Sequence, residues 1–252
     1  MTSAQELPDR PEFTVRHAGT ERKAQFVGRD PGTNVALLRL AQPIVGALTA
    51  AAAAPRVGSL TLVVGADDAG APTGRLAMVH ATGPEWHSQA GGRIDALLRL
   101  DVRLGADEGG LVLDSGGLLL GMATAGPRRR ALVIPGATID RVLDPLLAEG
   151  RIARGWLGVG LQPVMVPDSL RAAAGRDSGM MVVNLAADGP SATAGVLPGD
   201  ILLDLDGTPV RRARALAAAM GPEQIGKSVT VRLLRAGALQ TLSVVISARP
   251  AG

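Results

Sequence analysis

The sequence predicts a mostly β chain in which a long all-β region is followed by a smaller unit of mixed α and β structure. From Phe13 to about Pro135, short apolar runs are broken by Gly, Pro and Asp, a pattern typical of sandwiches and barrels. After Pro135 the apolar residues recur at helical spacing, and beyond Gly155 strand patterns return. At 252 residues, 46% of them hydrophobic, the chain is long enough for two modest domains with separate cores.

The expected strands of the first region are short and closely spaced. They are FTVRH (13–17), KAQFVG (23–28), VALLRL (35–40), LTLVVGA (60–66), RLAMVHAT (75–82), RIDALLRLD (93–101), LVLD (111–114), LLLGMAT (118–124) and ALVIP (131–135). Residues 41–58 are rich in Ala and Pro without alternation, so we expect a connection between two β units there. The polar residues 1–12 predict a disordered N-terminal tail.

A helix is expected over residues 137–149, at the end of the first region. Ile139, Val142, Leu143, Leu146 and Leu147 fall at helical spacing, and Gly150 supplies a C-terminal stop. In the second unit, a further helix over 211–221 carries Leu216 and Met220 on one face. The strands expected around that helix are WLGVGLQPV (156–164), MMVVNLA (180–186), DILLDLDG (200–207), SVTVRLLR (228–235) and QTLSVVIS (240–247).

Composition excludes several kinds of chemistry. With Cys 0 and only three scattered His, disulfides, thiol catalysis and zinc sites are not expected, and neither a metal nor a cofactor is predicted. The net charge is only +3, and the Arg128–Arg130 run has no aromatic stacking partners beside it, so a solvated turn is favoured over nucleic-acid contact. No run approaches the roughly 18 to 20 apolar residues that span a bilayer.

The N-terminal sequence bears on the compartment. MTSAQELPDRPEF has neither the basic start nor the apolar core of a secretory signal. We therefore expect a cytoplasmic protein if Met1 is the native start, and a periplasmic one if an export signal has been removed.

Three stretches resemble the HtrA family of trypsin-like serine proteases with a C-terminal PDZ domain. Residues 131–164 are similar to the junction between protease and PDZ domain, 28–40 to the segment around the catalytic aspartate, and 178–210 to the core of the PDZ domain. The resemblance implies a trypsin-like double β-barrel, a linker helix and an α+β PDZ domain. Only about three strands of the first barrel are found, so we expect that barrel to be incomplete. The expected domains are 13–150, trypsin-like with the linker helix, and 151–252, PDZ.

The same resemblance bears on catalysis. Asp114-Ser115-Gly116-Gly117 looks like a nucleophile motif, but the family register places it on a hairpin turn, and Asp, Ser and Gly are good turn residues. The nucleophile position falls instead in Gly105–Gly110, on Glu108 or Gly109, and the aspartate position holds Asn34. None of His17, His80 and His87 occupies the family's histidine motif. The resulting interpretation is a degenerate, catalytically inactive member of the family, a pseudoenzyme.

A binding function is predicted for the second unit. Trp156-Leu157-Gly158-Val159 corresponds to the PDZ loop whose backbone N–H groups hold a peptide carboxylate. The resemblance places Leu216 and Met220 on the wall of the side-chain pocket and Arg154 just before the loop. The alternative for this loop is a purely structural one, in which Trp156 and Leu157 anchor the domain junction.

These features lead to one preferred function and two alternatives. The preferred one is an adaptor, scaffold or assembly factor that binds protein C-termini or exposed peptide segments. The first alternative is an active HtrA-type serine endopeptidase whose catalytic histidine lies upstream of the given sequence or whose nucleophile is misplaced by the register. The second is a purely structural subunit. A protein partner that completes the first barrel, and assembly into an oligomer, are compatible with all three.

Overall fold

The computed structural model divides into two compact units, Met1–Ile152 and Ala153–Gly252. The residues that the structure describes are 1–5, 7–17, 19–44, 46, 48–67, 69–105, 109–212, 216 and 219–250. The boundary lies two residues beyond the expected one at 150, because Ile152 still packs against the core of the first unit. Within the described residues, no helix has the length and apolar character needed to cross a membrane.

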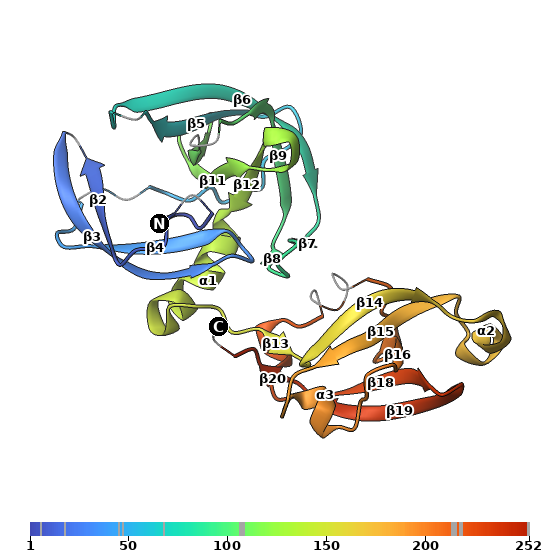
Figure 1. The fold of residues 1–252 in the computed structure, drawn as a ribbon. Coiled ribbons are helices and arrows are strands. Elements are labelled where there is room, and N and C mark those ends of the chain that lie inside the picture. Colours follow the sequence, from blue (N-terminus) through green and yellow to red (C-terminus); the bar gives the residue numbers. More distant parts are fainter. Residues whose placement is uncertain are drawn as a thin grey trace. The chain divides into compact units, whose positions relative to one another are not determined.

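The N-terminal part of the first unit is a curled half-barrel of four antiparallel strands (Figure 1, blue). The strands follow the order β1-β4-β3-β2, with bounds β1 Thr2–Ser3, β2 Glu12–His17, β3 Thr20–Asp30 and β4 Val35–Leu40. The sequence predicts a disordered tail over residues 1–12, and the structure differs. Thr2 and Ser3 pair with β4, and Ser3 and Ala4 are buried. Ser3 Oγ and the Gln5 backbone N–H also donate hydrogen bonds to Asn34 Oδ1, in the turn before β4.

The second part of the first unit is a closed six-stranded barrel. Its strands are β5 Leu60–Ala66, β6 Pro72–Gly83, β9 Leu97–Arg103, β10 Gly110–Asp114, β11 Leu119–Ala125 and β12 Arg130–Pro135, in the closed order β10-β11-β12-β9-β6-β5. Inward positions alternate along the strands and fill the barrel with aliphatic side chains such as Val79, Leu100 and Val112. A short pair, β7 Trp86–His87 with β8 Arg93–Ile94, and a 3-10 turn, η1 Pro127–Arg129, complete this part. The prediction of a mostly β first unit with an incomplete first barrel is confirmed.

Helix α1, Gly136–Glu149, follows the closed barrel and packs against the half-barrel strands β3 and β4. Ile139, Val142 and Leu146 are buried, as the helical spacing predicts, and Leu143 packs partly buried against the same core. Leu147 is 46% exposed, so the buried face is narrower than the predicted one. Gly150 ends the helix with φ +70°, and its carbonyl accepts a 3.1 Å hydrogen bond from Arg29 N. A Cβ on Gly28 would lie 2.2 Å from the Gly150 oxygen, so glycine is what allows this close approach.

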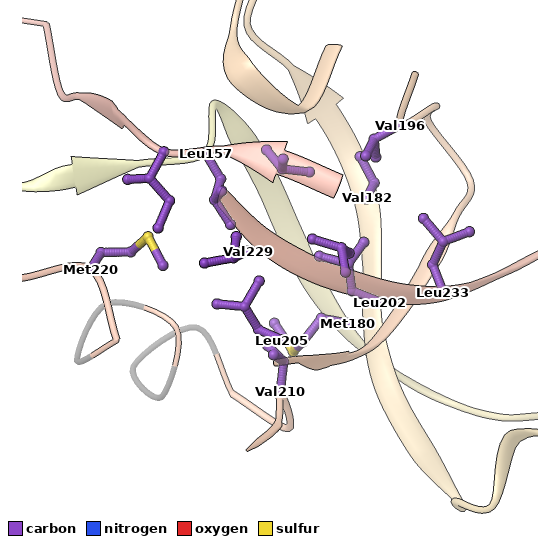
Figure 2. Close-up of a cluster of buried hydrophobic side chains, with 13 residues drawn as sticks. Leu157, Met180, Val182, Val196, Leu202, Leu205, Val210, Met220, Val229 and Leu233 are labelled. Atoms are coloured by element: carbon purple, nitrogen blue, oxygen red, sulfur yellow. The ribbon is translucent and has the colours of Figure 1, made fainter. Parts of the chain in front are cut away.

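The second unit is built on one antiparallel sheet in the order β14-β15-β16-β18-β19, with β17 paired to β16. The bounds of its elements are β13 Gly155–Trp156, β14 Val159–Met165, α2 Asp168–Ala174, β15 Ser178–Leu185, α3 Pro190–Thr193, β16 Ile201–Leu205, β17 Thr208–Pro209, η2 Pro222–Gln224, β18 Ser228–Arg235, β19 Ala238–Val245 and β20 Ser247–Ala248. Its core contains Leu157, Met180, Val229 and Met220 (Figure 2). Residues 213–215, 217 and 218 of the expected helix over 211–221 lie outside the described residues, and Leu216 is helical.

Candidate functional site

The first candidate site is a hydrogen-bonded cluster of four neutral polar side chains where the half-barrel faces β11. Asn34 stands just before β4 with φ +58°. Its Oδ1 accepts hydrogen bonds from Ser3 Oγ (3.1 Å) and from the Gln5 backbone N–H (2.9 Å). Asn34 Nδ2 and Gln5 Nε2 each donate a 2.8 Å bond to Thr124 Oγ1. We call Ser3, Gln5, Asn34 and Thr124 the amide cluster.

The loop that presents Asn34 is held by a buried carboxylate. Asp30, 2% exposed, accepts hydrogen bonds from Gly32 N (3.1 Å), Thr33 N (3.0 Å) and Thr33 Oγ1 (2.8 Å). This local arrangement fixes the turn and therefore the direction of the Asn34 amide. Side-chain amides donate and accept hydrogen bonds but do not take up a proton near neutral pH. The amide cluster can therefore position groups, and a general base has to come from another residue.

Of the amide cluster, the sequence analysis singled out Asn34 alone. Gln5 and Ser3 were missed because residues 1–12 carry no apolar pattern and were expected to be a tail. The signal that could have found them is the pairing potential of a short polar strand beside the turn that holds Asn34. Thr124 sits on β11 and is 5% exposed, and a buried threonine in an apolar strand was the available hint.

The predicted nucleophile loop, Gly105–Gly110, is only partly described. Glu108 lies outside the described residues, together with its neighbours 106 and 107, so its role stays a prediction. The end of the loop is tightly enclosed. A Cβ on Gly109 would lie 2.8 Å from the Ala123 oxygen, and one on Gly110 would lie 2.0 Å from the Val64 oxygen. Both glycines are therefore needed where the chain enters the barrel between β5 and β11.

Ser115 lies in the exposed turn between β10 and β11. Asp114 Oδ1 accepts hydrogen bonds from Gly116 N (2.8 Å) and Leu118 N (2.9 Å), and Gly117 has φ +80°. These are the contacts of an Asx-type turn, as the family register predicts. His17, His80 and His87 lie on three different strands, β2, β6 and β7.

The second candidate site is the loop before β14 in the second unit. The Leu157 carbonyl accepts a 3.0 Å hydrogen bond from Ser191 N, and the Gly158 carbonyl accepts a 2.8 Å bond from Ala186 N. Within the described part of the chain, the backbone N–H groups of Leu157 and Gly158 have no hydrogen-bond partner. Both residues are buried. Two adjacent buried donors without partners mark a place where an external acceptor can bind.

The surroundings of this loop include an open sheet edge and an apolar wall. β14 is the terminal strand of its sheet and pairs with β15 on one side. Leu157 and Met220 belong to the same buried cluster, and Leu216 and Val159 pack against it (Figure 2 shows Leu157 and Met220). The structure thus brings together most of the predicted peptide-binding residues.

Trp156 and Arg154 hold the loop from outside this cluster. Trp156 pairs with Ser247 in the short β13–β20 sheet, and Gly155 N donates a 3.0 Å bond to the Met220 carbonyl. The Arg154 carbonyl accepts a 2.8 Å bond from Arg249 N. These backbone contacts anchor the loop within its own unit.

Both units match known protein families. Residues 1–122 match the trypsin-like peptidase domain and residues 155–246 match the PDZ domain. Among solved structures, the HtrA-type protease AlgW with decapeptide is 25% identical with a TM-score of 0.75, covering 100% of this chain and 79% of that one. The serine endoprotease from Yersinia pestis is 23% identical with a TM-score of 0.74, covering 99% of this chain and 84% of that one, and supports the fold.

Curated relatives agree with the structural neighbours. A probable periplasmic serine endoprotease DegP-like of Brucella suis biovar 1 (strain 1330) is 28% identical over 92% of this chain and 47% of its own length. The protein of the same name from Rhizobium meliloti (strain 1021) is 29% identical over 99% of this chain and 51% of its own length. The chain therefore spans about half the length of these relatives.

The fold and its two matches define a trypsin-like peptidase domain followed by a PDZ domain. Across both units the chain is similar to proteases of the HtrA family. The interpretation of the chain as a pseudoenzyme is wrong by these comparisons, because its relatives are named serine endoproteases and its structural neighbours are HtrA proteases, which points to an enzyme. That interpretation depended on Asn34, on Glu108 and on the missing histidine motif, and Glu108 lies outside the described residues.

Proposed function

We propose that this chain is part of an HtrA-type serine endoprotease and that its PDZ domain binds the C-terminal segment of a polypeptide. Peptide binding is supported by the N–H groups of the buried residues Leu157 and Gly158, which have no partners among the described residues. Endoprotease activity is inferred from the names of the relatives, and the chain spans about half the length of those relatives. The same relatives make the periplasm the proposed compartment.

The geometry of the second unit suits a peptide with a free C-terminus. A carboxylate accepts charge-assisted hydrogen bonds from adjacent backbone donors, here Leu157 and Gly158. The residues preceding the carboxylate then extend as an added strand along the free edge of β14. The terminal side chain reaches the apolar wall formed by Leu157, Leu216 and Met220. AlgW, the structural relative, has been solved with a decapeptide.

Peptide cleavage makes further demands on the first unit. It needs a nucleophile and a general base, and the hydrogen bonds of the amide cluster supply neither. The amide cluster ties the half-barrel to strand β11 of the closed barrel, through bonds from Gln5 and Asn34 to Thr124. The 105–110 loop contains no Ser, Thr or Cys, so we propose Ser115 as the nucleophile.

Peptide binding is tested by fluorescence anisotropy with a labelled decapeptide that ends in an aliphatic residue. The same peptide with a C-terminal amide is the matched control. We expect the amide to bind about tenfold more weakly or worse, because it loses hydrogen bonds to a charged acceptor. Equal affinities for the two peptides would contradict the proposed carboxylate site.

Endoprotease activity is tested separately, by cleavage of unfolded casein by the intact protein and by its Ser115→Ala variant. We expect casein to be cleaved and the cleavage to be lost in Ser115→Ala, because the 105–110 loop contains no hydroxyl or thiol that could replace Ser115. Unchanged cleavage in the variant would show that Ser115 is not the nucleophile. Peptide binding without any cleavage by the intact protein would favour an adaptor or assembly role over the endoprotease.

A further inference from the structure

A pocket of about 610 Å³ opens in the first unit where α1 begins, at one end of the closed barrel. Its size is within the range of small-ligand sites in proteins. Five segments contribute to it: the connection 50–55, the end of β6 at 82–83, the turn and start of β9 at 95–98, the start of β11 at 119–120, and the end of β12 with the first turns of α1. None of these residues belongs to the amide cluster or to the 105–110 loop.

The wall of the pocket is largely aliphatic. Five consecutive alanines, Ala50–Ala54, form one side, and Leu97, Leu98 and Leu120 form much of the other. The connection is held in place by backbone bonds, from Ala51 N to the Leu119 carbonyl (2.9 Å) and from Leu119 N to the Thr49 carbonyl (2.8 Å). Methyl and isobutyl groups of this kind favour an unbranched or short-branched aliphatic chain over a polar one.

The charged residues that line the pocket, Asp95 and Asp140, are both acidic. Asp95 is already compensated. Its Oδ2 accepts hydrogen bonds from Thr138 Oγ1 (2.8 Å) and Arg141 Nη2 (2.9 Å), and its Oδ1 accepts one from Arg93 Nη2 (3.1 Å). Asp95 therefore supplies a rigid edge of the pocket rather than a free charge.

Asp140 differs from Asp95 in having its charge available. It lies exposed in α1, and among the described residues it forms no ion pair. The N-terminal end of α1 also lines the pocket, and its macrodipole amounts to roughly half a positive charge. A full carboxylate charge outweighs that contribution, so the open side of the pocket favours a cation.

We propose that this pocket binds an aliphatic chain that ends in a cationic group. The methylenes lie against the alanine connection and the leucines, and the cation pairs with the Asp140 carboxylate at the rim. Two sources offer this chemistry, the side chain of a lysine in a peptide and a free aliphatic amine. The proposal is independent of the PDZ peptide site and of protease activity.

The probe for the pocket is hexylamine, with hexan-1-ol as its uncharged counterpart, followed by NMR of the chain labelled with ¹³C in alanine methyl groups. We expect hexylamine to shift the methyl signals of Ala50–Ala54 more than signals elsewhere. Asp140→Asn should weaken hexylamine binding about two- to fivefold, the range of an exposed ion pair, and leave hexan-1-ol unchanged. Asp144→Asn is the matched control, since Asp144 is exposed one turn further along the same helix and does not line the pocket.

A second variant tests the cavity itself. Ala137→Phe places a ring at the mouth of the pocket, on an exposed position of α1, and should reduce binding of both probes. Equal affinity for amine and alcohol, equal effects of the two aspartate variants, or no shift at Ala50–Ala54 would each overturn the proposal. Acetyl-Leu-Lys-Leu-amide, with its norleucine counterpart as the uncharged control, then distinguishes a peptide lysine from a free amine as the ligand. If the ligand is a peptide lysine, the lysine peptide should bind more tightly than hexylamine.

Discussion

The backbone N–H of Gln5 donates a 2.9 Å hydrogen bond to Oδ1 of Asn34, and the two side chains share Thr124 Oγ1 as acceptor. This arrangement joins the N-terminal residues, the turn before β4 and strand β11 through neutral groups. A region that reads as a tail in the sequence is therefore part of the packing between the half-barrel and the closed barrel.

Asn34→Ala is expected to lower the free energy of unfolding by roughly 1 to 3 kcal/mol, because Ser3 Oγ and the Gln5 N–H lose their acceptor and Thr124 loses one of its two donors. Asn34 also has φ +58°, so alanine adds backbone strain there. Asn34→Gly removes that strain and keeps the loss of hydrogen bonds. Urea unfolding of the two variants separates the contributions, and wild-type stability in both would show that the amide cluster contributes nothing measurable.

Gly28→Ala is expected to destabilise the first unit by about 1 to 3 kcal/mol, the usual cost of overpacking. The new Cβ would lie 2.2 Å from the carbonyl oxygen at the end of α1. The position of the Cβ is fixed by its own backbone and the oxygen belongs to the backbone, so neither can rotate away. Gly74→Ala is the control, because a Cβ there meets only Leu62 Cδ1 at 3.7 Å. Thermal unfolding followed by circular dichroism makes the comparison, and equal midpoints for the two variants would contradict the close approach.

Asp95 predicts a pH dependence of stability. Burial raises the pKa of its carboxyl, but hydrogen bonds from Arg141 and Thr138 and the charges of Arg141 and Arg93 outweigh this, and the net pKa is lowered. A carboxyl whose folded pKa lies below its unfolded value stabilises the fold above the unfolded pKa, about 3.9 for Asp, and loses that contribution as pH falls through the folded pKa. The stability difference between wild type and Asp95→Asn should therefore shrink between pH 6 and pH 3 in urea titrations. A difference that is constant over this range would show that the ion pairs contribute no pH-dependent stability.

Much of the fold could be predicted from local patterns. The helical spacing of Ile139, Val142 and Leu146 placed α1 to within one residue at its start, and Gly150 placed its end. The hydrogen-bond partners of the candidate sites could not be predicted in the same way. Thr124 is separated from Gln5 by 119 positions, and no local pattern connects two residues that meet only through the tertiary fold.

The PDZ loop could be located from the sequence, but its hydrogen bonds could not. The resemblance assigns residues Trp156–Val159 to the loop. Only the structure shows that the Leu157 and Gly158 carbonyls accept hydrogen bonds while their N–H groups have no partner among the described residues. Helices α2 and α3 were not predicted because both are short, with seven and four residues. Helices of this length owe their stability to tertiary packing rather than to sequence propensity.

Gly158→Ala provides a direct test of the loop conformation. Gly158 has φ +73°, and a Cβ there would lie 3.2 Å from Gly189 Cα and 3.3 Å from the Trp156 ring. We expect the loop to shift and the two N–H groups to change direction, which should weaken binding of a peptide carboxylate at least fivefold.

Gly175→Ala is the matched control, because Gly175 has φ +66° at the end of α2 and its Cβ would meet nothing within 4 Å. Both variants carry the same left-handed backbone strain of about 1 to 2 kcal/mol, so a similar loss of stability is expected from each. Peptide anisotropy and thermal unfolding, measured on both, distinguish a binding loop from a general loss of folding. If the two variants bound the peptide with equal affinity, the loop of Gly158 would not be the carboxylate site.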